Sequence, residues 1–289
     1  MEQYQVDSII DAIKGINESG SIVKNYVLPV LLPMLSAFLS YFISVRVFNR
    51  QEIVKAEKRK VDVVNQSMCK LFSALTTLLQ VKSNYYDGVC ASSNPIERAL
   101  MFPVVVIYGT PISIDVSELT CFISEGKVAN SGKYKNMEVD IIMIEDLLRR
   151  YNSLLEAIKL RNDFDKECRG KIISAAGSPV PSARMKNDDI VNVIGASDAA
   201  YYVDLTERLM LMIDGLLNDI HSLLKEFPLY SESKINKKLT RGYAQILKFE
   251  GLDIRFPLLV NPITKPSIGL MSHYLGYRED DILKRYPYC

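Results

Sequence analysis

The chain has 289 residues, of which 24% are charged and 48% are hydrophobic, and its formal net charge is +1. This near-neutral balance excludes a global electrostatic attraction to nucleic acid, although it leaves open a local basic patch that binds nucleic acid. The cysteines are scattered and form no CxxC pair, which indicates free thiols in a reducing compartment. The chain has only two histidines, too few for most zinc sites and catalytic triads, so we expect no cofactor and no metal.

The first elements in chain order are an amphipathic segment, residues 1–24, and a run of uncharged and mostly apolar residues, 25–45. A helix that rises 1.5 Å per residue needs about twenty apolar residues to cross the hydrocarbon core of a bilayer. The run therefore predicts a transmembrane helix. The alternatives are a buried helix of a soluble protein and a signal peptide, although a basic start and a cleavage site of small residues are missing.

A set of basic side chains, which we call the basic collar, follows the predicted span: Arg46, Arg50, Lys55, Lys58, Arg59 and Lys60. Only Lys14 and Lys24 precede the span. Positive charge favours the cytoplasmic side, so we expect a single-pass protein of the cell inner membrane with its N-terminus outside and its C-terminal domain in the cytoplasm. The collar is expected to contact lipid headgroups, or else to be a solvated helix face.

Small residues recur along one stripe of the predicted span: Ser36, Ala37, Ser40 and Ser44. Such a stripe lets helices approach closely in a membrane, which predicts a homo-oligomer or the polar lining of a pore. In the alternative interpretation each hydroxyl only bonds a carbonyl of its own helix.

Residues 46–230 are expected to form a helical bundle domain. Apolar residues alternate three and four apart in three segments, which run from the span to Gly88, from Met137 to about Cys168 and from Asp198 to Phe227. Ser197 or Asp198 is the expected N-cap of the third helix and Pro228 its stop. The fold class is therefore mainly α, an antiparallel bundle behind one transmembrane helix.

The remaining segments carry other patterns. The β-branched run at residues 103–108 and the alternating residues 112–116 predict a small β-hairpin, after which Asp115 caps a short helix. Residues 170–189 are expected to be a loop. The tail, residues 231–289, is expected to pack on the bundle and to end in a helix over residues 274–285.

Arg161 and Asn162 on the second predicted helix are the candidate catalytic residues. The pair resembles the start of the motif of HEPN ribonucleases, which place an arginine, often followed by asparagine, and a histidine on one helix. The positions of the histidine are occupied here by Lys166, Glu167 and Cys168. The resemblance implies a degenerate HEPN-like bundle that serves as a scaffold, with an intact nuclease as the alternative.

The order of segments is also similar to that of uncharacterised single-pass bacterial proteins, which place a basic juxtamembrane helix before a segment like Ile112–Leu119 and a helix with an Arg-Asn pair. Some proteins of this plan are antiviral-defence effectors, including a pore-forming accessory of an RNA-targeting CRISPR system. The resemblance implies a membrane effector or adaptor that self-associates and binds a cytoplasmic protein or ligand. The alternatives are a membrane-tethered enzyme acting on RNA or nucleotides and a ligand sensor.

Overall fold

The computed structural model describes residues 28–106, 110–122, 137–176, 185–249, 257–259 and 261–287, so the amphipathic segment 1–24 lies outside the described residues. These ranges are mainly helical and contain no strand. The chain divides into two compact units. The first consists of Met1–Arg59 with Lys238–Arg241, and the second of Lys60–Lys237 with Gly242–Cys289.

Helix α2 (Leu28–Cys90) is continuous from the apolar run to the end of the first heptad segment, with Pro33 inside it. A helix that continues unbroken beyond the apolar run is what the absence of Pro and Gly between residue 46 and Gly88 predicted. The predicted heptad seam is confirmed, because its side chains are all buried: Val61, Val64, Met68, Leu71, Leu75, Leu78 and Tyr85. Lys82 occupies the remaining seam position and is buried as well.

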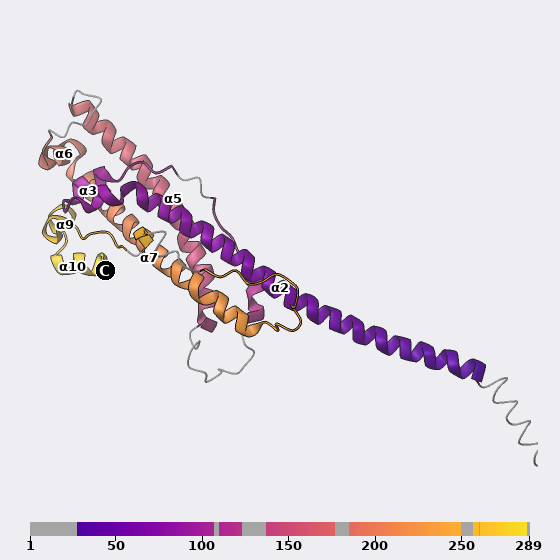
Figure 1. Ribbon diagram of the computed structural model, residues 1–289. Helices are drawn as coiled ribbons and strands as arrows, with labels where there is room; N and C mark the ends of the chain where they lie inside the picture. Colours follow the sequence, from indigo (N-terminus) through magenta and orange to yellow (C-terminus); the bar gives the residue numbers. More distant parts are fainter. Residues whose placement is uncertain are drawn as a thin grey trace, which may run out of the picture. The chain divides into compact units, whose positions relative to one another are not determined.

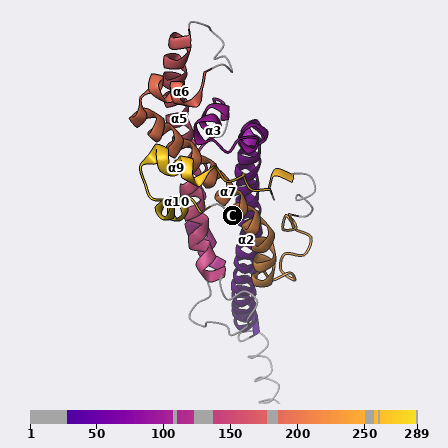
Figure 2. The ribbon, with the colours of Figure 1, turned by 90° about the vertical axis from the view of Figure 1, so that its left-hand side faces the viewer.

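Helices α5 (Met137–Ala176) and α7 (Ala196–Lys234) complete the second unit together with the part of α2 after Arg59. This part of α2 lies side by side with α5 and α7 in both views (Figure 1, Figure 2). Their buried apolar side chains form one core cluster, to which the short helices also contribute. Burial of this apolar stripe is the main stabilising contribution to the bundle.

The direction of the helices differs from the antiparallel bundle that the sequence predicts. Arg150 on α5 pairs with Asp219 on α7 at 2.8 Å, whereas Arg161 contacts Tyr202, so these two helices are antiparallel. The described residues 105–106 and 110–113 are ordered antiparallel to α5 and also to α2, where Lys70 donates to the carbonyl of Ser113 at 2.6 Å. Helices α2 and α5 are therefore parallel. Short loops impose antiparallel neighbours, but the connection from residue 91 to residue 136 is long enough to return along the bundle.

The predicted β-hairpin is wrong for the described residues, since segments 103–106 and 110–115 are extended without pairing as strands. Side-chain amides of α5 take the place of a neighbouring strand. Asn162 accepts from the N–H of Val105 at 3.1 Å and donates to its carbonyl at 2.7 Å. Asn152 holds Ile112 in the same way, with both bonds at 2.9 Å. We call this two-point arrangement an amide clamp, and it satisfies main-chain groups that a strand partner would otherwise satisfy.

Both predicted ends of α7 are wrong. Its N-cap is Gly195, with φ +98°, and no side chain caps the helix, because Asp198 instead pairs with Lys171 at 2.8 Å. Pro228 lies inside the helix and is buried. A proline costs roughly 3 kcal/mol in a helix interior. Burial of Tyr230 offsets this cost, and the Tyr230 hydroxyl also bonds the carbonyl of Phe122 at 2.8 Å.

Short helices cover the ends of the bundle: α3 (Pro95–Met101), α4 (Val116–Leu119), the 3-10 turn η2 (Thr120–Phe122) and α6 (Asn187–Ile194). The prediction that Asp115 caps a short helix is confirmed, since its carboxylate accepts from the N–H of Ser117 at 3.0 Å. The loop predicted at residues 170–189 is wrong in part. Helix α5 continues to Ala176 and α6 begins at Asn187, while residues 177–184 lie outside the described residues. Burial of Ile172 and Ile190 explains why both ends are helical.

The described part of the tail packs on the bundle. It contains a 3-10 turn η3 (Pro257–Leu259) and helices α9 (Ile268–Leu275) and α10 (Glu279–Arg285), in place of the one final helix that was predicted. Gly276, with φ +70°, ends α9 in the left-handed conformation and separates the two helices. The described part of the tail buries five large apolar side chains against the core: Ile235, Ile263, Met271, Ile282 and Tyr286.

Candidate functional site

The N-terminal half of α2 is the most unusual surface of the molecule. Its large apolar side chains from Val30 to Val45 are exposed, and none of its most apolar window is buried. That window has a mean hydropathy of 1.8, so one helix among the described residues is long and apolar enough to span a membrane. A contiguous apolar surface of this size marks contact with a membrane or a partner.

The predicted stripe of small residues lies on the same exposed surface, which includes Ser36, Ala37, Ser40 and Ser44. The Ser36 hydroxyl donates to the carbonyl of Pro33 at 2.9 Å. This is the local bond of the alternative interpretation, and it satisfies the hydroxyl without a second helix. Self-association through the stripe therefore stays a prediction.

The basic collar continues along α2 after the apolar surface. Its residues Arg46, Arg50, Lys55 and Arg59 are exposed, whereas Lys58 and Lys60 are half-buried. The first unit also includes Lys238–Arg241, so two further basic residues from a distant part of the sequence group with the helix. Sequence reasoning did not connect these segments, because no local pattern links residue 238 to residue 59.

Arg161 is fully buried and makes main-chain contacts at the end of α3. Its guanidinium donates to the carbonyls of Ala99 and Phe102 at 2.7 Å each and to that of Pro103 at 3.2 Å. The Phe102 ring lies 4.5 Å from the guanidinium carbon. Asn162 beside it forms the amide clamp on Val105. Both candidate catalytic residues are thus engaged with the protein's own backbone.

A buried polar network extends from Arg161. Asp165 pairs with Arg161 at 3.1 Å and with Arg169 at 2.8 Å, and it also accepts from the Tyr202 hydroxyl. Burial raises the pKa of Tyr202 and lowers that of Arg161. Both groups keep their ordinary protonation state at neutral pH, as a structural network requires.

The positions where the HEPN motif places its histidine also have structural partners. Lys166 lies 3.4 Å from Asp163 and Glu167 lies 3.1 Å from Lys171, both on the surface. Cys168 is buried, and burial raises the pKa of its thiol to about 11. A protonated thiol is a poor nucleophile and a poor base at neutral pH. None of these groups is arranged for acid–base catalysis.

A second set of buried charges joins α2, α3 and α7. Arg98 binds Glu207 through two parallel bonds of 2.6 and 3.0 Å, and neither side chain is exposed. Lys82 pairs with Asp214 at 2.8 Å. The position of Lys82 in the apolar seam was a sequence signal for a buried partner, but nothing in the sequence pointed to the buried pair of Arg98 and Glu207.

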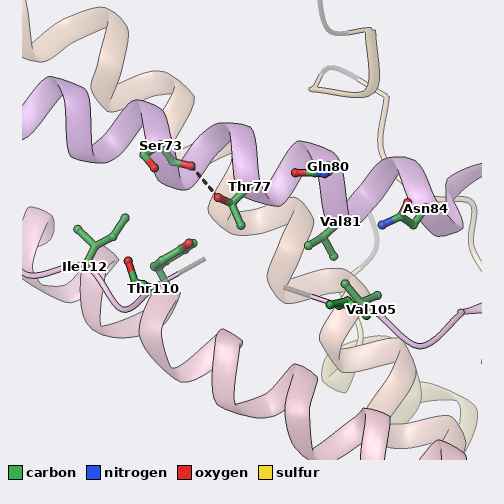
Figure 3. A pocket seen from close by; sticks show the side chains of 10 residues that line it. Ser73, Thr77, Gln80, Val81, Asn84, Val105, Thr110 and Ile112 are labelled. Carbon is green, nitrogen blue, oxygen red and sulfur yellow. Dashed lines mark hydrogen bonds between the residues drawn. The ribbon is translucent and has the colours of Figure 1, made fainter. Parts of the chain in front are cut away.

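Two open cavities flank the extended segment that the amide clamps hold. The smaller, of about 230 Å³, lies between α2, α5 and residues 105–106 with 110–112 (Figure 3). Figure 3 shows Thr77 and Val81 pointing from α2 toward Thr110 and Val105. The larger, of about 490 Å³, lies on the other side of residues 111–114 against Glu145, Arg149 and Glu156 of α5. We call the smaller cavity the polar cleft.

The side chains that line the polar cleft are uncharged: Ser73, Thr77, Gln80, Val81, Asn84, Val105, Val106, Thr110, Ile112 and Tyr151. Within the described ranges no group of three or more His, Cys, Asp or Glu side chains is arranged to hold a metal ion. Comparison with known proteins finds no match to a family model, a curated protein or a solved structure.

Proposed function

We propose that this chain is a single-pass membrane adaptor, anchored by the apolar half of α2 and acting through its helical bundle by binding rather than by catalysis. The observation that carries the proposal is the exposed apolar surface of α2. Monomeric soluble proteins rarely expose a contiguous apolar surface of this size to water. The basic collar directly after it supports a cytoplasmic bundle. A role as a self-associating effector of bacterial defence belongs to the same proposal.

The absence of catalysis is supported by the candidate residues themselves. The terminal guanidinium nitrogens of Arg161 and the amide nitrogen of Asn162 donate to main-chain carbonyls, and Arg161 is buried. A catalytic side chain has to be accessible to a substrate. In a protein that acts by binding through another surface, these two side chains can be buried. The competing proposal, a membrane-tethered RNA-acting enzyme, requires these two side chains to be accessible.

Charges in the middle of the span should release the protein from the membrane. Each arginine at the centre of a transmembrane helix opposes insertion by about 2.5–3.5 kcal/mol. We expect the double variant Leu35→Arg/Leu39→Arg to be extracted by alkaline carbonate while the unchanged protein stays in the membrane pellet. Phe48→Arg/Ile53→Arg is the matched control, because these exposed residues of the same helix lie beyond Arg46, and it should stay in the pellet. Extraction of the unchanged protein would contradict the anchor.

The orientation predicts which cysteines a membrane-impermeant maleimide reaches. Cys69 is exposed and follows the span, so in bacterial spheroplasts it should react only after lysis. A cysteine introduced by Ser8→Cys precedes the span and should react before lysis. Mass spectrometry of the unchanged protein and of the Cys69→Ser variant shows how much of the label is attached to Cys69. Labelling of Cys69 in intact spheroplasts would place the bundle outside the cell and contradict the topology.

A further inference from the structure

The polar cleft has a chemical character that restricts what it binds. No lysine, arginine, aspartate or glutamate lines it. Burial raises the pKa of Tyr151, so its phenol is neutral at physiological pH. A phosphate or carboxylate would find no counter-charge here, and a cation would find no carboxylate. The cleft therefore favours a neutral ligand with both hydrogen-bond donors and acceptors.

Two amide side chains on α2, those of Gln80 and Asn84, are exposed to solvent at this cleft. Neither side chain forms a hydrogen bond or other polar contact within the part of the chain that the structure describes. Each amide offers a carbonyl acceptor and an NH₂ donor, which together match the N–H and C=O of a peptide unit. They carry the functional groups needed for an amide clamp.

The rest of the bundle shows how this protein uses such amides. Asn162 clamps Val105 and Asn152 clamps Ile112, as described above. A third asparagine on α2, Asn65, accepts from the N–H of Leu247 at 2.9 Å and donates to the carbonyl of Gln245 at 3.0 Å. In all three cases the amide of a long helix holds an extended stretch of main chain. Hydrogen bonding of main-chain N–H and C=O groups by an asparagine amide is therefore a recurring way in which this fold holds extended segments.

The wall opposite α2 supplies main-chain groups of its own. Asn162 occupies the N–H and C=O of Val105, and in an extended backbone the groups of the next residue point to the opposite side. The main-chain groups of Val106 therefore point away from Asn162, and they have no hydrogen-bond partner among the described residues. The Val106 side chain is 67% exposed. Beside the two amides, this residue presents a backbone edge that no other described residue pairs with.

We propose that the polar cleft binds an extended, uncharged peptide segment of a partner protein, with its main chain held by the amides of Gln80 and Asn84 and by the backbone of Val106. The cleft, at about 230 Å³, is smaller than the roughly 300–1,000 Å³ of sites for whole cofactors, which suits a short stretch of peptide. Main-chain bonds to an exposed edge are an established mode of peptide recognition. This inference rests on the adaptor role proposed above and names the class of partner.

A capped tetrapeptide of alternating threonine and valine is the test probe, titrated against the full-length chain in detergent by saturation-transfer NMR. Gln80→Met and Asn84→Leu remove the amides while keeping side-chain size, and both new residues are good helix formers. We expect each to weaken peptide binding about tenfold, which corresponds to 1.4 kcal/mol. Gln66→Met is the matched control, since Gln66 is an exposed glutamine of the same helix outside the cleft, and it should leave the affinity unchanged.

Three results would overturn the inference: no binding at millimolar peptide, equal binding by all four proteins, or amide-dependent binding of adenosine in place of the peptide. The last result would assign the cleft to a nucleoside. Carbonate extraction on the same preparations separates this outcome from the anchor. If the protein stays in the membrane but does not bind the peptide, only the peptide site is refuted. If carbonate releases the unchanged protein, the membrane adaptor is refuted.

Discussion

Replacing Glu207 by glutamine should lower the free energy of unfolding by about 3–5 kcal/mol, the usual cost of breaking a buried ion pair. The change leaves the Arg98 guanidinium in the core without its counter-charge. Both side chains are fully buried, and the shorter of their two bonds is 2.6 Å. Water cannot compensate for the lost carboxylate, so the variant has to accept an isolated charge or distort the core.

The remaining contacts of Arg98 explain why the effect should spread beyond one pair. The guanidinium also donates to the carbonyl of Val89 at 3.2 Å and to the Thr264 hydroxyl at 3.3 Å. It therefore links the end of α2 and the C-terminal tail to α7. Loss of Glu207 removes the anion that orients these bonds, so we expect the tail to become more sensitive to proteolysis as the melting temperature falls.

Thermal unfolding of the full chain in detergent measures the change. At about 2–4 °C per kcal/mol for a domain of this size, the melting temperature should fall by roughly 6–20 °C. Glu156→Gln is the matched control, because it breaks an exposed pair with Lys159 whose side chains are both 68% exposed. Exposed pairs contribute about 0–1 kcal/mol. The double variant Arg98→Met/Glu207→Leu should recover part of the loss, since it leaves no isolated charge. Equal melting temperatures for Glu207→Gln and Glu156→Gln would contradict the prediction.

The sequence was sufficient to predict what depends on local periodicity. The apolar run and the heptad seam predicted the course of α2. Both are patterns of apolar residues at helical spacing, which can be recognised in the local sequence. The start of α5 at Met137 and the cap at Asp115 were predicted for the same reason. These features need only neighbours within a few turns.

Features that depend on distant residues were not predicted. A run of valines favours strands, but Asn162 satisfies the main chain of Val105 from α5 and removes the need for a strand partner. Pro228 disfavours a helix, yet tertiary burial of Tyr230 is sufficient to continue it. The polar cleft could not be predicted either, since it forms only where α2 meets residues 105–106 and 110–112 in the folded chain.

Replacing Arg161 by methionine should destabilise the protein by about 3–5 kcal/mol, because this arginine holds the turn after α3 to α5. The change leaves the carbonyls of Ala99 and Phe102 without the donor they share, and Asp165 loses one of its two cations. Arg161→Lys should be nearly as harmful. An ammonium group cannot reproduce the planar fork that reaches several carbonyls at once.

This expectation separates the binding protein from the enzyme. A catalytic arginine can be replaced with loss of activity and little loss of stability, whereas a structural arginine cannot. Thermal unfolding of Arg161→Met should show a fall of roughly 6–20 °C. Lys166→Met, on the exposed face of the same helix, should melt like the unchanged protein. If Arg161→Met kept its melting temperature and the unchanged protein cleaved RNA, Arg161 would belong to an active site. A large loss of stability without any RNA cleavage would instead assign a structural role to Arg161 and Asn162. The pair would then hold the extended segment that borders the polar cleft against α5.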